Sequence, residues 1–147
     1  VARGRAAAEQ YPLAAAARPA MSVLRDTTGE SVQLYVRDGE SRVCVAAVES
    51  PHGLRTIVPV GAALPMDRGS AGRALSGEHT RTGWLATVGE REPGVASVSA
   101  PVVGRDGRIL AAVSVSGPIE RLGRSPGRQH GDAVAAAARD ITAAYDA

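Results

Sequence analysis

Four serines occupy alternate positions in two stretches of the sequence that otherwise consist of small and apolar residues. Ser97 and Ser99 lie in the first stretch, and Ser114 and Ser116 lie in the second. Because side chains alternate between the two faces of a strand, each pair points to one side of its strand. Hydroxyl groups on a sheet face with little bulk between them can line a cavity and donate hydrogen bonds to a small polar ligand. The alternative is a solvent-exposed sheet face, on which alternating serines are ordinary.

The two serine pairs belong to a predicted β-hairpin. The strand-like runs 95–103 and 109–117 flank Arg105-Asp106-Gly107-Arg108, and Asp-Gly is a strong hairpin signal. A two- or four-residue turn places both serine pairs on the same face of the sheet, whereas a three-residue turn would reverse that parity. The opposite face of the second strand is apolar and is expected to face the core. It carries Ile109, Ala111, Val113 and Val115.

A second group of small residues, Gly69-Ser70-Ala71-Gly72, stands where a helix is predicted to begin. Small side chains at a helix start allow a ligand to approach the backbone N–H groups, and the helix dipole favours an anion there. Glycine and serine also cap helices for purely structural reasons. Combined with the serines of the hairpin, the segment outlines a candidate carboxylate site. Arg55 could add positive charge, although an arginine in a strand is usually solvated or blocks an edge.

The sequence offers little for metal binding or covalent catalysis. The three histidines, His52, His79 and His130, lack a Cys, Asp or Glu partner at a recognised metal-ligand spacing. No serine lies in a G-x-S-x-G elbow, and none has an evident histidine and acid assigned to it. Glu90 and Glu92 are interpreted as surface charge around a strand start rather than as a catalytic pair. We therefore predict no metal, no cofactor and no enzymatic activity.

Composition limits the class of protein. A chain of 147 residues is long enough for one domain with a real core, which must be aliphatic because aromatic residues make up only 3% and Phe is absent. The formal net charge of +2 is too weak to indicate nucleic-acid binding by this chain itself. The single Cys44 excludes an internal disulfide and fits a reducing cytoplasm. No apolar run approaches the roughly 20 residues of a membrane span.

Helices are predicted at both ends of the chain. Residues 5–17 are rich in alanine, and Pro19 is expected to begin a second helix that runs to Thr28 and stops at Gly29. Residues 129–144 are predicted to form an amphipathic helix. Its apolar face carries Val134, Ala138, Ile141 and Tyr145. The single Trp84 is expected to pack in the core rather than to wall a pocket.

Strand patterns dominate the middle of the sequence. Asp38-Gly39 predicts a first hairpin, in whose first strand apolar and polar residues alternate so that one face is buried. Because tight turns require antiparallel pairing, we predict an α+β fold with helices on one face of an antiparallel sheet. The alternating residues are Val32, Leu34 and Val36 against Gln33 and Tyr35. The other predicted elements are strands 31–37, 41–48 and 54–60, and a helix that begins within 69–75.

Several segments, taken in order, carry a family pattern. They are TGESVQL (28–34), HGLR with the following VG and LP (52–65), SAGRAL (70–75), GW and GE (83–90), GVASVSAPV (94–102) and VSVSGP (113–118). Over about residues 18–147 the chain resembles the C-terminal effector-binding domain of IclR-type bacterial transcriptional regulators. The blocks GEREPGVASVSAPV and VSVSGPIERL are most similar to actinobacterial members associated with amino-acid metabolism.

The resemblance implies a GAF-like or profilin-like α+β fold, an antiparallel sheet flanked by helices, that binds a small metabolite. A thiol position of the family falls on Ser97, and a polar contact that is an acid in some relatives falls on Thr87. Changes at these two positions leave the identity of the metabolite open. The family pattern places ligand contacts on Ser70, Ala71, Thr87, Ser97, Ser114 and Ser116, with apolar walls from the expected strand around Leu54, Thr56 and Val58.

The chain departs from the family pattern in two places. The N-terminal winged helix-turn-helix domain of the family is not in the sequence, so residues 1–17 are expected to be the end of the connecting helix and 18–147 the effector-binding domain. Because the chain begins at Val1 without an initiator Met, we expect it to be a fragment of a longer protein. Relatives usually have another helical segment where only a short stretch separates Leu75 from Gly83 here.

We therefore predict a cytoplasmic ligand-sensing domain of a dimeric or tetrameric transcriptional regulator, which binds a small organic acid or an amino-acid-related metabolite. Operator DNA is expected to be contacted only through the missing N-terminal domain, and no membrane is involved. One alternative is a small-molecule hydrolase with a serine nucleophile, which needs a histidine near Ser97, Ser114 or Ser116. Another is a pure oligomerisation module, whose sheet face would be filled by its own side chains.

Overall fold

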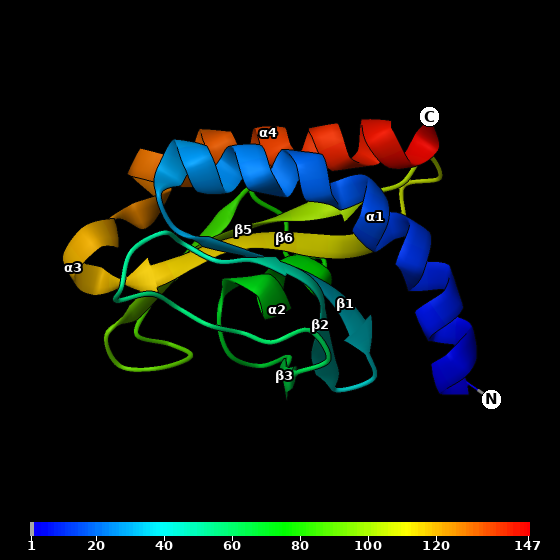
Figure 1. The fold of residues 1–147 in the computed structure, drawn as a ribbon, viewed down its shortest axis with the longest axis horizontal. Coiled ribbons are helices and arrows are strands. Elements are labelled where there is room, and N and C mark those ends of the chain that lie inside the picture. The colour runs from blue at the N-terminus through cyan, green and yellow to red at the C-terminus, as the bar shows by residue number, and fades with distance from the viewer. Residues whose placement is uncertain (1) are drawn as a thin grey trace.

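The computed structural model describes the backbone of residues 2–147 and the side chains of residues 12–147. Position 1, the first residue of the predicted connecting helix, lies outside the described residues. Six antiparallel strands form one curled sheet in the order β3-β2-β1-β6-β5-β4 (Figure 1). The strands are β1 (Ser31–Asp38), β2 (Ser41–Val48), β3 (Ala63–Pro65), β4 (Leu85–Val88), β5 (Val95–Val103) and β6 (Ile109–Pro118). The predicted α+β fold, an antiparallel sheet flanked by helices, is confirmed.

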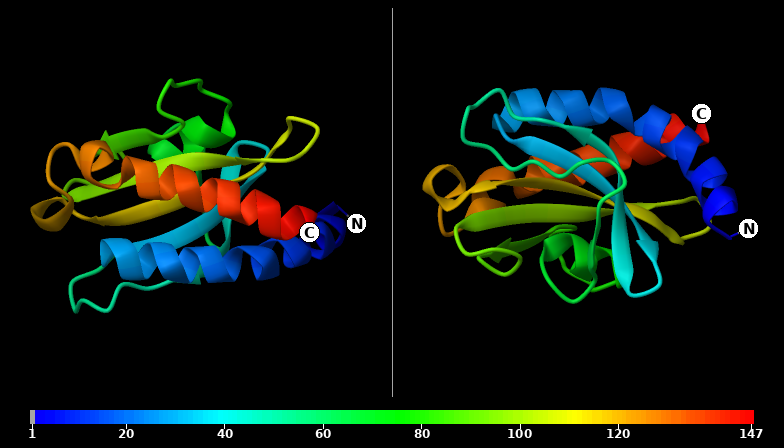
Figure 2. Two further views of the ribbon diagram at one scale, coloured as in Figure 1. Left: turned by 90° about the horizontal axis from the view of Figure 1, so that it is seen from above. Right: turned by 60° about the horizontal axis from the view of Figure 1, so that its bottom comes forward.

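Helices cover both faces of the sheet. The two long helices, α1 (Ala2–Thr28) and α4 (Pro126–Asp146), run side by side in opposite directions across one face, and both chain ends lie at the same end of the molecule (Figures 1 and 2). The short α2 (Ser70–Leu75) lies on the other face, and α3 (Ile119–Leu122) follows β6 at one end. The prediction that all helices lie on one face is therefore wrong for α2, which packs on the serine side of the sheet.

The N-terminal helix is one element rather than two. Residues 2–28 form a continuous α1 with Pro12 and Pro19 inside it, whereas the sequence predicted a break at Pro19. A proline inside a helix removes one backbone hydrogen bond and bends the axis, and Figure 1 shows the first turns of α1 leaning away from the rest. The predicted stop is confirmed, because Gly29 has a positive φ of 75° and its N–H donates to Arg25 O at 2.7 Å.

Both predicted hairpins are present, and the second has the predicted parity. Ser97 pairs with Ser116 and Ser99 with Ser114, so all four serines share one face. In the first hairpin the expectation of a single buried face is wrong. Gln33 and Tyr35 are as buried as the apolar residues with which they alternate, because β1 lies between β2 and β6 and α2 covers its second face.

The predicted strand over residues 54–60 does not form. The chain runs there as an extended loop without sheet pairing, and the edge strand β3 follows at Ala63–Pro65 instead. Its apolar side chains do not alternate into a core: Leu54 is 68% exposed and Ile57 is 58% exposed, while Val58 is buried. Backbone hydrogen bonds across the sheet edge go from Gly61 N to Cys44 O and from Cys44 N to Ala62 O, after the predicted strand has ended.

The two faces of the sheet bury different kinds of side chain. Beneath α1 and α4, aliphatic residues of β1, β5 and β6 form the main core. A smaller core lies under α2 and includes Tyr35, Cys44, Met66 and Leu85. The predicted apolar face of the C-terminal helix is buried at Val134, Ala138 and Ile141 but not at Tyr145, which is 38% exposed at the end of the helix. Within residues 2–147 no helix combines the length and apolarity that a membrane crossing requires.

Trp84 packs against α4, as predicted, at a point where the helix has no side chains. A Cβ atom added at Gly127 or Gly131 would overlap the indole ring. The two glycines lie four residues apart, so they present one bare strip of the helix to the ring. This close contact fixes the start of β4 against α4.

We expect Gly131→Ala to destabilise the protein, because the new methyl group must displace a packed indole ring. Overpacking of this kind costs about 1–3 kcal/mol. The matched control is Gly53→Ala, since Gly53 has open space around its Cα and an ordinary φ. Urea unfolding of both variants measures the difference, and an equal midpoint for the two would show that the indole ring moves freely.

Candidate functional site

The hydroxyl groups that the sequence placed on one sheet face converge on the start of α2. Ser70 is fully buried, and its Oγ lies 2.7 Å from Ser97 Oγ and 2.7 Å from Ser99 Oγ. Ser99 in turn donates to Ser114 Oγ at 2.8 Å, and Thr87 Oγ1 lies 3.1 Å from Ser97 Oγ. One connected array of five hydroxyls therefore links α2 to β4, β5 and β6.

Ser116 lies on the same face but belongs to a separate pair. Its hydroxyl donates to Gln33 Oε1 at 2.9 Å, and both residues are buried. Gln33 also lies beside Ser114 in the β1–β6 register. A buried amide contributes both a donor and an acceptor to a site, so Gln33 adds a polar group that alternation alone classed as solvent-facing.

The backbone at the start of α2 approaches its surroundings closely. A Cβ atom at Gly72 would overlap Met66 O, so only glycine permits this contact between the helix and the chain before it. The N–H of Gly69 donates to Glu90 Oε1 at 3.2 Å, and Glu90 also forms an ion pair with Arg73 at 3.0 Å. Because α2 has only six residues, it contributes the Ser70 hydroxyl and nearby N–H groups rather than a strong macrodipole.

Arg42 completes the site, and the sequence analysis missed it. Arg42 is only 2% exposed, and its guanidinium carbon lies over the Tyr35 ring, 5.1 Å from the ring centroid. Nη1 donates to Pro65 O at 2.7 Å and also to Arg68 O, while Nε is buried without a partner. Burial lowers the pKa of Arg42, and burial likewise raises the pKa of Tyr35 to about 12. An arginine next to a hairpin turn gives no sequence signal of burial.

A small cavity of about 10 Å³ lies among these groups. A single water molecule needs about this much space, so the cavity is closed to any larger molecule in this conformation. Arg91, from the turn before β5, also reaches it, with a side chain that is 18% exposed. The lining residues are Tyr35, Arg42, Gly69, Ser70, Ala71, Arg91, Ser97, Ser114 and Ser116, and we call this set the serine pocket.

Five of the nine predicted site residues thus meet in the serine pocket, and the others lie elsewhere. Thr87 is in the hydroxyl array but does not line the cavity. Leu54 and Thr56 line a separate open hollow of about 370 Å³, together with Arg91 and Glu92. Val58 is buried in the small core, where its carbonyl lies 3.9 Å from Cys44 Sγ. Arg55 does not reach the pocket, because it pairs with Glu49 at 2.7 Å.

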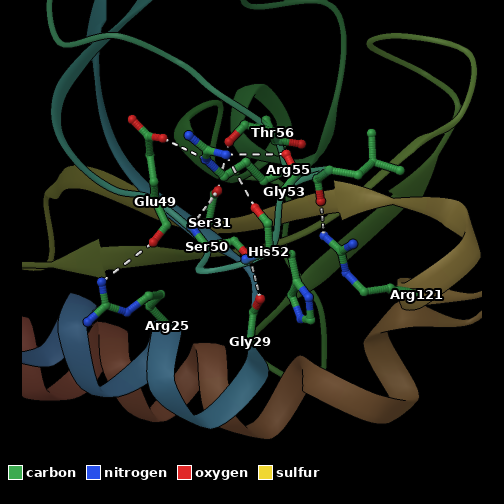
Figure 3. Close-up of polar contacts among 11 residues, drawn as sticks. Arg25, Gly29, Ser31, Glu49, Ser50, His52, Gly53, Arg55, Thr56 and Arg121 are labelled. Atoms are coloured by element: carbon green, nitrogen blue, oxygen red, sulfur yellow. Dashed lines mark hydrogen bonds and ion pairs between the residues drawn. The ribbon is translucent and has the colours of Figure 1, made fainter.

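A polar network holds the loop that replaces the predicted strand (Figure 3). Ser31 Oγ donates to Thr56 O at 2.7 Å and accepts from Ser50 N at 2.9 Å. Ser50 Oγ donates to Gly29 O at 2.6 Å. Buried side-chain hydroxyls here supply the backbone partners that a neighbouring strand would otherwise provide, so the loop is ordered without sheet pairing.

An ion pair anchors the same loop to the end of β6. Arg121 binds the buried carboxylate of Glu30 through two hydrogen bonds of 2.7 and 2.8 Å, and it also donates to Leu54 O at 2.6 Å. The acid raises the pKa of Arg121 further above its ordinary value. The backbone of Leu54 is therefore fixed while its side chain stays exposed at the rim of the open hollow.

The structure gives no support to metal binding or to a serine nucleophile. Among residues 12–147, no three His, Cys, Asp or Glu side chains are grouped as metal ligands. The hydroxyls of Ser97, Ser114 and Ser116 bond to other hydroxyls or to Gln33, and in this part of the chain none bonds to a histidine. His52 and His79 are exposed at the surface, and His130 lies on α4 across the sheet.

The chain matches the family described as "Bacterial transcriptional regulator IclR C-terminal" over residues 5–82 and 77–143. The two matched segments meet between α2 and β4, where the connection was predicted to be short. The HTH-type transcriptional repressor AllR of Escherichia coli is 26% identical over 163 positions, which cover 87% of this chain and 60% of AllR. The HTH-type transcriptional regulator BhcR of Paracoccus denitrificans is 24% identical and 58% covered. The chain therefore spans about three fifths of the length of these relatives.

Solved structures show the same fold. An IclR-family transcriptional regulator from Rhodococcus sp. is 30% identical with a TM-score of 0.77, over 86% of this chain and 61% of that one. The C-terminal domain of a transcriptional regulator from Vibrio cholerae is 26% identical with a TM-score of 0.73, over 85% of this chain and 93% of that domain. The second match shows that a separate C-terminal domain is nearly coextensive with this chain.

We expect Ser70→Ala to lower the stability of the ligand-free protein, because the hydroxyls of Ser97 and Ser99 would each lose a buried partner. Ser97 and Ser99 each keep one other hydroxyl partner, so the expected loss is that of the hydrogen bonds themselves, about 0.5–1.5 kcal/mol for each. Urea unfolding measures the loss, with Ser125→Ala as a control, since Ser125 is exposed and makes no side-chain cap hydrogen bond. A Ser70→Ala variant as stable as the control would contradict the hydroxyl array.

Proposed function

Because the chain belongs to the IclR family of bacterial transcriptional regulators and matches their C-terminal domain, we propose that it senses a small metabolite for such a regulator. The ligand would be a small organic acid or an amino-acid-related metabolite bound at the serine pocket. In the whole protein, a DNA-binding domain outside this chain would contact the operator, in the cytoplasm and as a dimer or tetramer. The domain itself would bind the metabolite without transforming it.

The observation that carries this proposal is the burial of many polar groups at one place. Ser70, Ser99, Ser114, Ser116 and Gln33 are each no more than 4% exposed. Burying polar groups opposes folding unless they are hydrogen-bonded, and a stable core needs none of them. A cluster of donors and acceptors that converges from α2 and the sheet is instead suited to fix the orientation of a small polar ligand.

Because the cavity is closed, ligand binding would require a conformational change. A metabolite of even a few heavy atoms exceeds about 10 Å³, so α2, the turn before β5 or Arg42 must move to admit it. A ligand that binds only the open form shifts the population toward that form by its differential affinity. Movement of these elements relative to α1, which leads toward the DNA-binding domain in the family, would carry the signal.

One observation favours a second candidate function. The serine face is nearly filled by the protein's own side chains, as expected of a module that only assembles subunits. The two candidates differ in whether any small molecule stabilises the folded chain. No observation favours the hydrolase alternative, because no described histidine is hydrogen-bonded to the serines of the pocket.

A thermal-shift screen of this chain against small carboxylates, amino acids and their biosynthetic intermediates tests the sensor. We expect a saturable rise in Tm with one chemical class, because a ligand selective for the folded state stabilises it by mass action. Ser114→Ala and Ser116→Ala should each weaken that ligand by about 1 kcal/mol or more, since each removes one hydrogen bond. Titration of the variants by calorimetry measures the change.

The control variant is Ser125→Ala, because Ser125 is exposed and its hydroxyl makes no cap hydrogen bond to α4. Its affinity should equal that of the unmodified chain. Unchanged affinity in both pocket variants would contradict the site, and the absence of a shift with every compound would favour the assembly module.

A further inference from the structure

We propose that Arg42 binds the carboxylate of the effector, so that a negative charge on the ligand is a condition of binding at the serine pocket. This inference rests on the proposed sensing function and adds a charge and an anchoring residue to it. The chemical class is a small carboxylate, and the corresponding neutral amide or alcohol would not replace it.

Arg42 is a buried cation without an anion. None of the ion pairs among residues 12–147 includes it, although the residue is only 2% exposed. An arginine keeps its proton at neutral pH, so the positive charge stays in the protein interior. Burying an unpaired charge opposes folding strongly, and buried charges in proteins are normally paired. No side chain among residues 12–147 supplies this partner, and a negative group on the ligand would do so.

One guanidinium nitrogen, Nε, is buried without a partner and is available to such a group. Nη1 is engaged by the carbonyls of Pro65 and Arg68, whereas no carbonyl or carboxylate among residues 12–147 accepts from Nε or Nη2. A carboxylate binds side-on to two neighbouring guanidinium nitrogens through two parallel hydrogen bonds. The Nε–Nη2 edge has this geometry, and the residue lines the serine pocket.

A second cation lies against the same space. A side chain on Gly69 would meet Arg42 Nη2 at 3.3 Å and Arg91 Cβ at 3.7 Å, so the two arginines flank one point. Arg91 has an acid of its own, the exposed Glu92 at 3.2 Å, but Arg42 has none. Two like charges that converge on a polar pocket repel each other, and an anion between them removes the repulsion. Their arrangement favours a charged ligand over a neutral one.

Arg42 also explains how such a ligand would open the pocket. Through Pro65 and Arg68 the guanidinium ties the segment between β3 and α2 over the serines. A carboxylate that competes for the guanidinium weakens those two hydrogen bonds and releases the segment. Arg91 lines both the serine pocket and the open hollow, so its displacement would join the two spaces.

Thermal unfolding of Arg42→Met tests the charge without any ligand. We expect its Tm in plain buffer to be equal to or higher than that of the unmodified chain, because a buried unpaired charge is replaced by an apolar side chain. The matched control is Arg37→Met, since Arg37 pairs with Arg42 across the hairpin and is exposed. A Tm well below that of the control would show that the hydrogen bonds of Arg42 to Pro65 O and Arg68 O outweigh the cost of its unpaired charge, and would overturn the proposal.

Matched pairs of compounds test the ligand class: acetate, propionate, lactate and succinate, each beside its amide at equal ionic strength. We expect a saturable rise in Tm with a carboxylate and none with its amide. That rise should disappear in Arg42→Met and persist, reduced, in Arg42→Lys, which keeps the charge but loses the two-nitrogen edge.

The outcomes separate this inference from the function on which it rests. A shift by an amide as large as by its carboxylate, or an undiminished carboxylate shift in Arg42→Met, would overturn the role of Arg42. If the same shift were lost in Ser114→Ala, the sensing function would still stand. Failure of every compound together with a destabilised Arg42→Met would overturn both.

Discussion

The antiparallel pairing of β5 with β6 determines which residues form the core and which form the site. Opposite Ser116 stands Ser97, and opposite Ser114 stands Ser99, so the valines between them all point toward α1 and α4. A shift by one residue in this register would turn the serines of one strand into the aliphatic core. It would also place the intervening valines beneath α2. The β-bulge between Val102 and Val103, which offsets the odd length of the turn at 104–108, and the burial of the valines therefore fix the polar face as firmly as the apolar one.

Local patterns predicted this part of the molecule because the information is local. Asp-Gly turns, the two-residue alternation of the second hairpin and the glycine after Thr28 act over a few residues, and each has the predicted result. The strand expected at 54–60 failed for the opposite reason. Its apolar residues suit a strand, but its backbone finds partners in the side chain of Ser31 and in Arg121, which are distant in sequence. No local pattern reports which partner a backbone group will find.

The residues of the candidate site likewise fall into those that a local pattern predicts and those that depend on distant elements. Alternation found the serines, because their burial follows from the strand to which they belong. Arg42, Gln33 and Tyr35 were missed, because they are buried only by α2 and by the segment that enters it from β3. A polar residue on a strand next to a turn is ordinarily solvated, and only the second layer reverses that expectation. The residues that give the pocket its charge are thus the ones that sequence alternation assigns to solvent.

The two faces of the sheet contribute to the free energy of folding with opposite sign. The face under α1 and α4 buries almost only aliphatic groups and a closely packed indole, which favours folding. The face under α2 buries hydroxyls, an amide and a guanidinium, each of which opposes folding unless it is bonded. Elements over the second face are held by the smaller apolar core under α2 and by hydrogen bonds that another polar group can replace. A ligand able to replace those hydrogen bonds would therefore open the second face and leave the first intact, as the proposed sensing function requires.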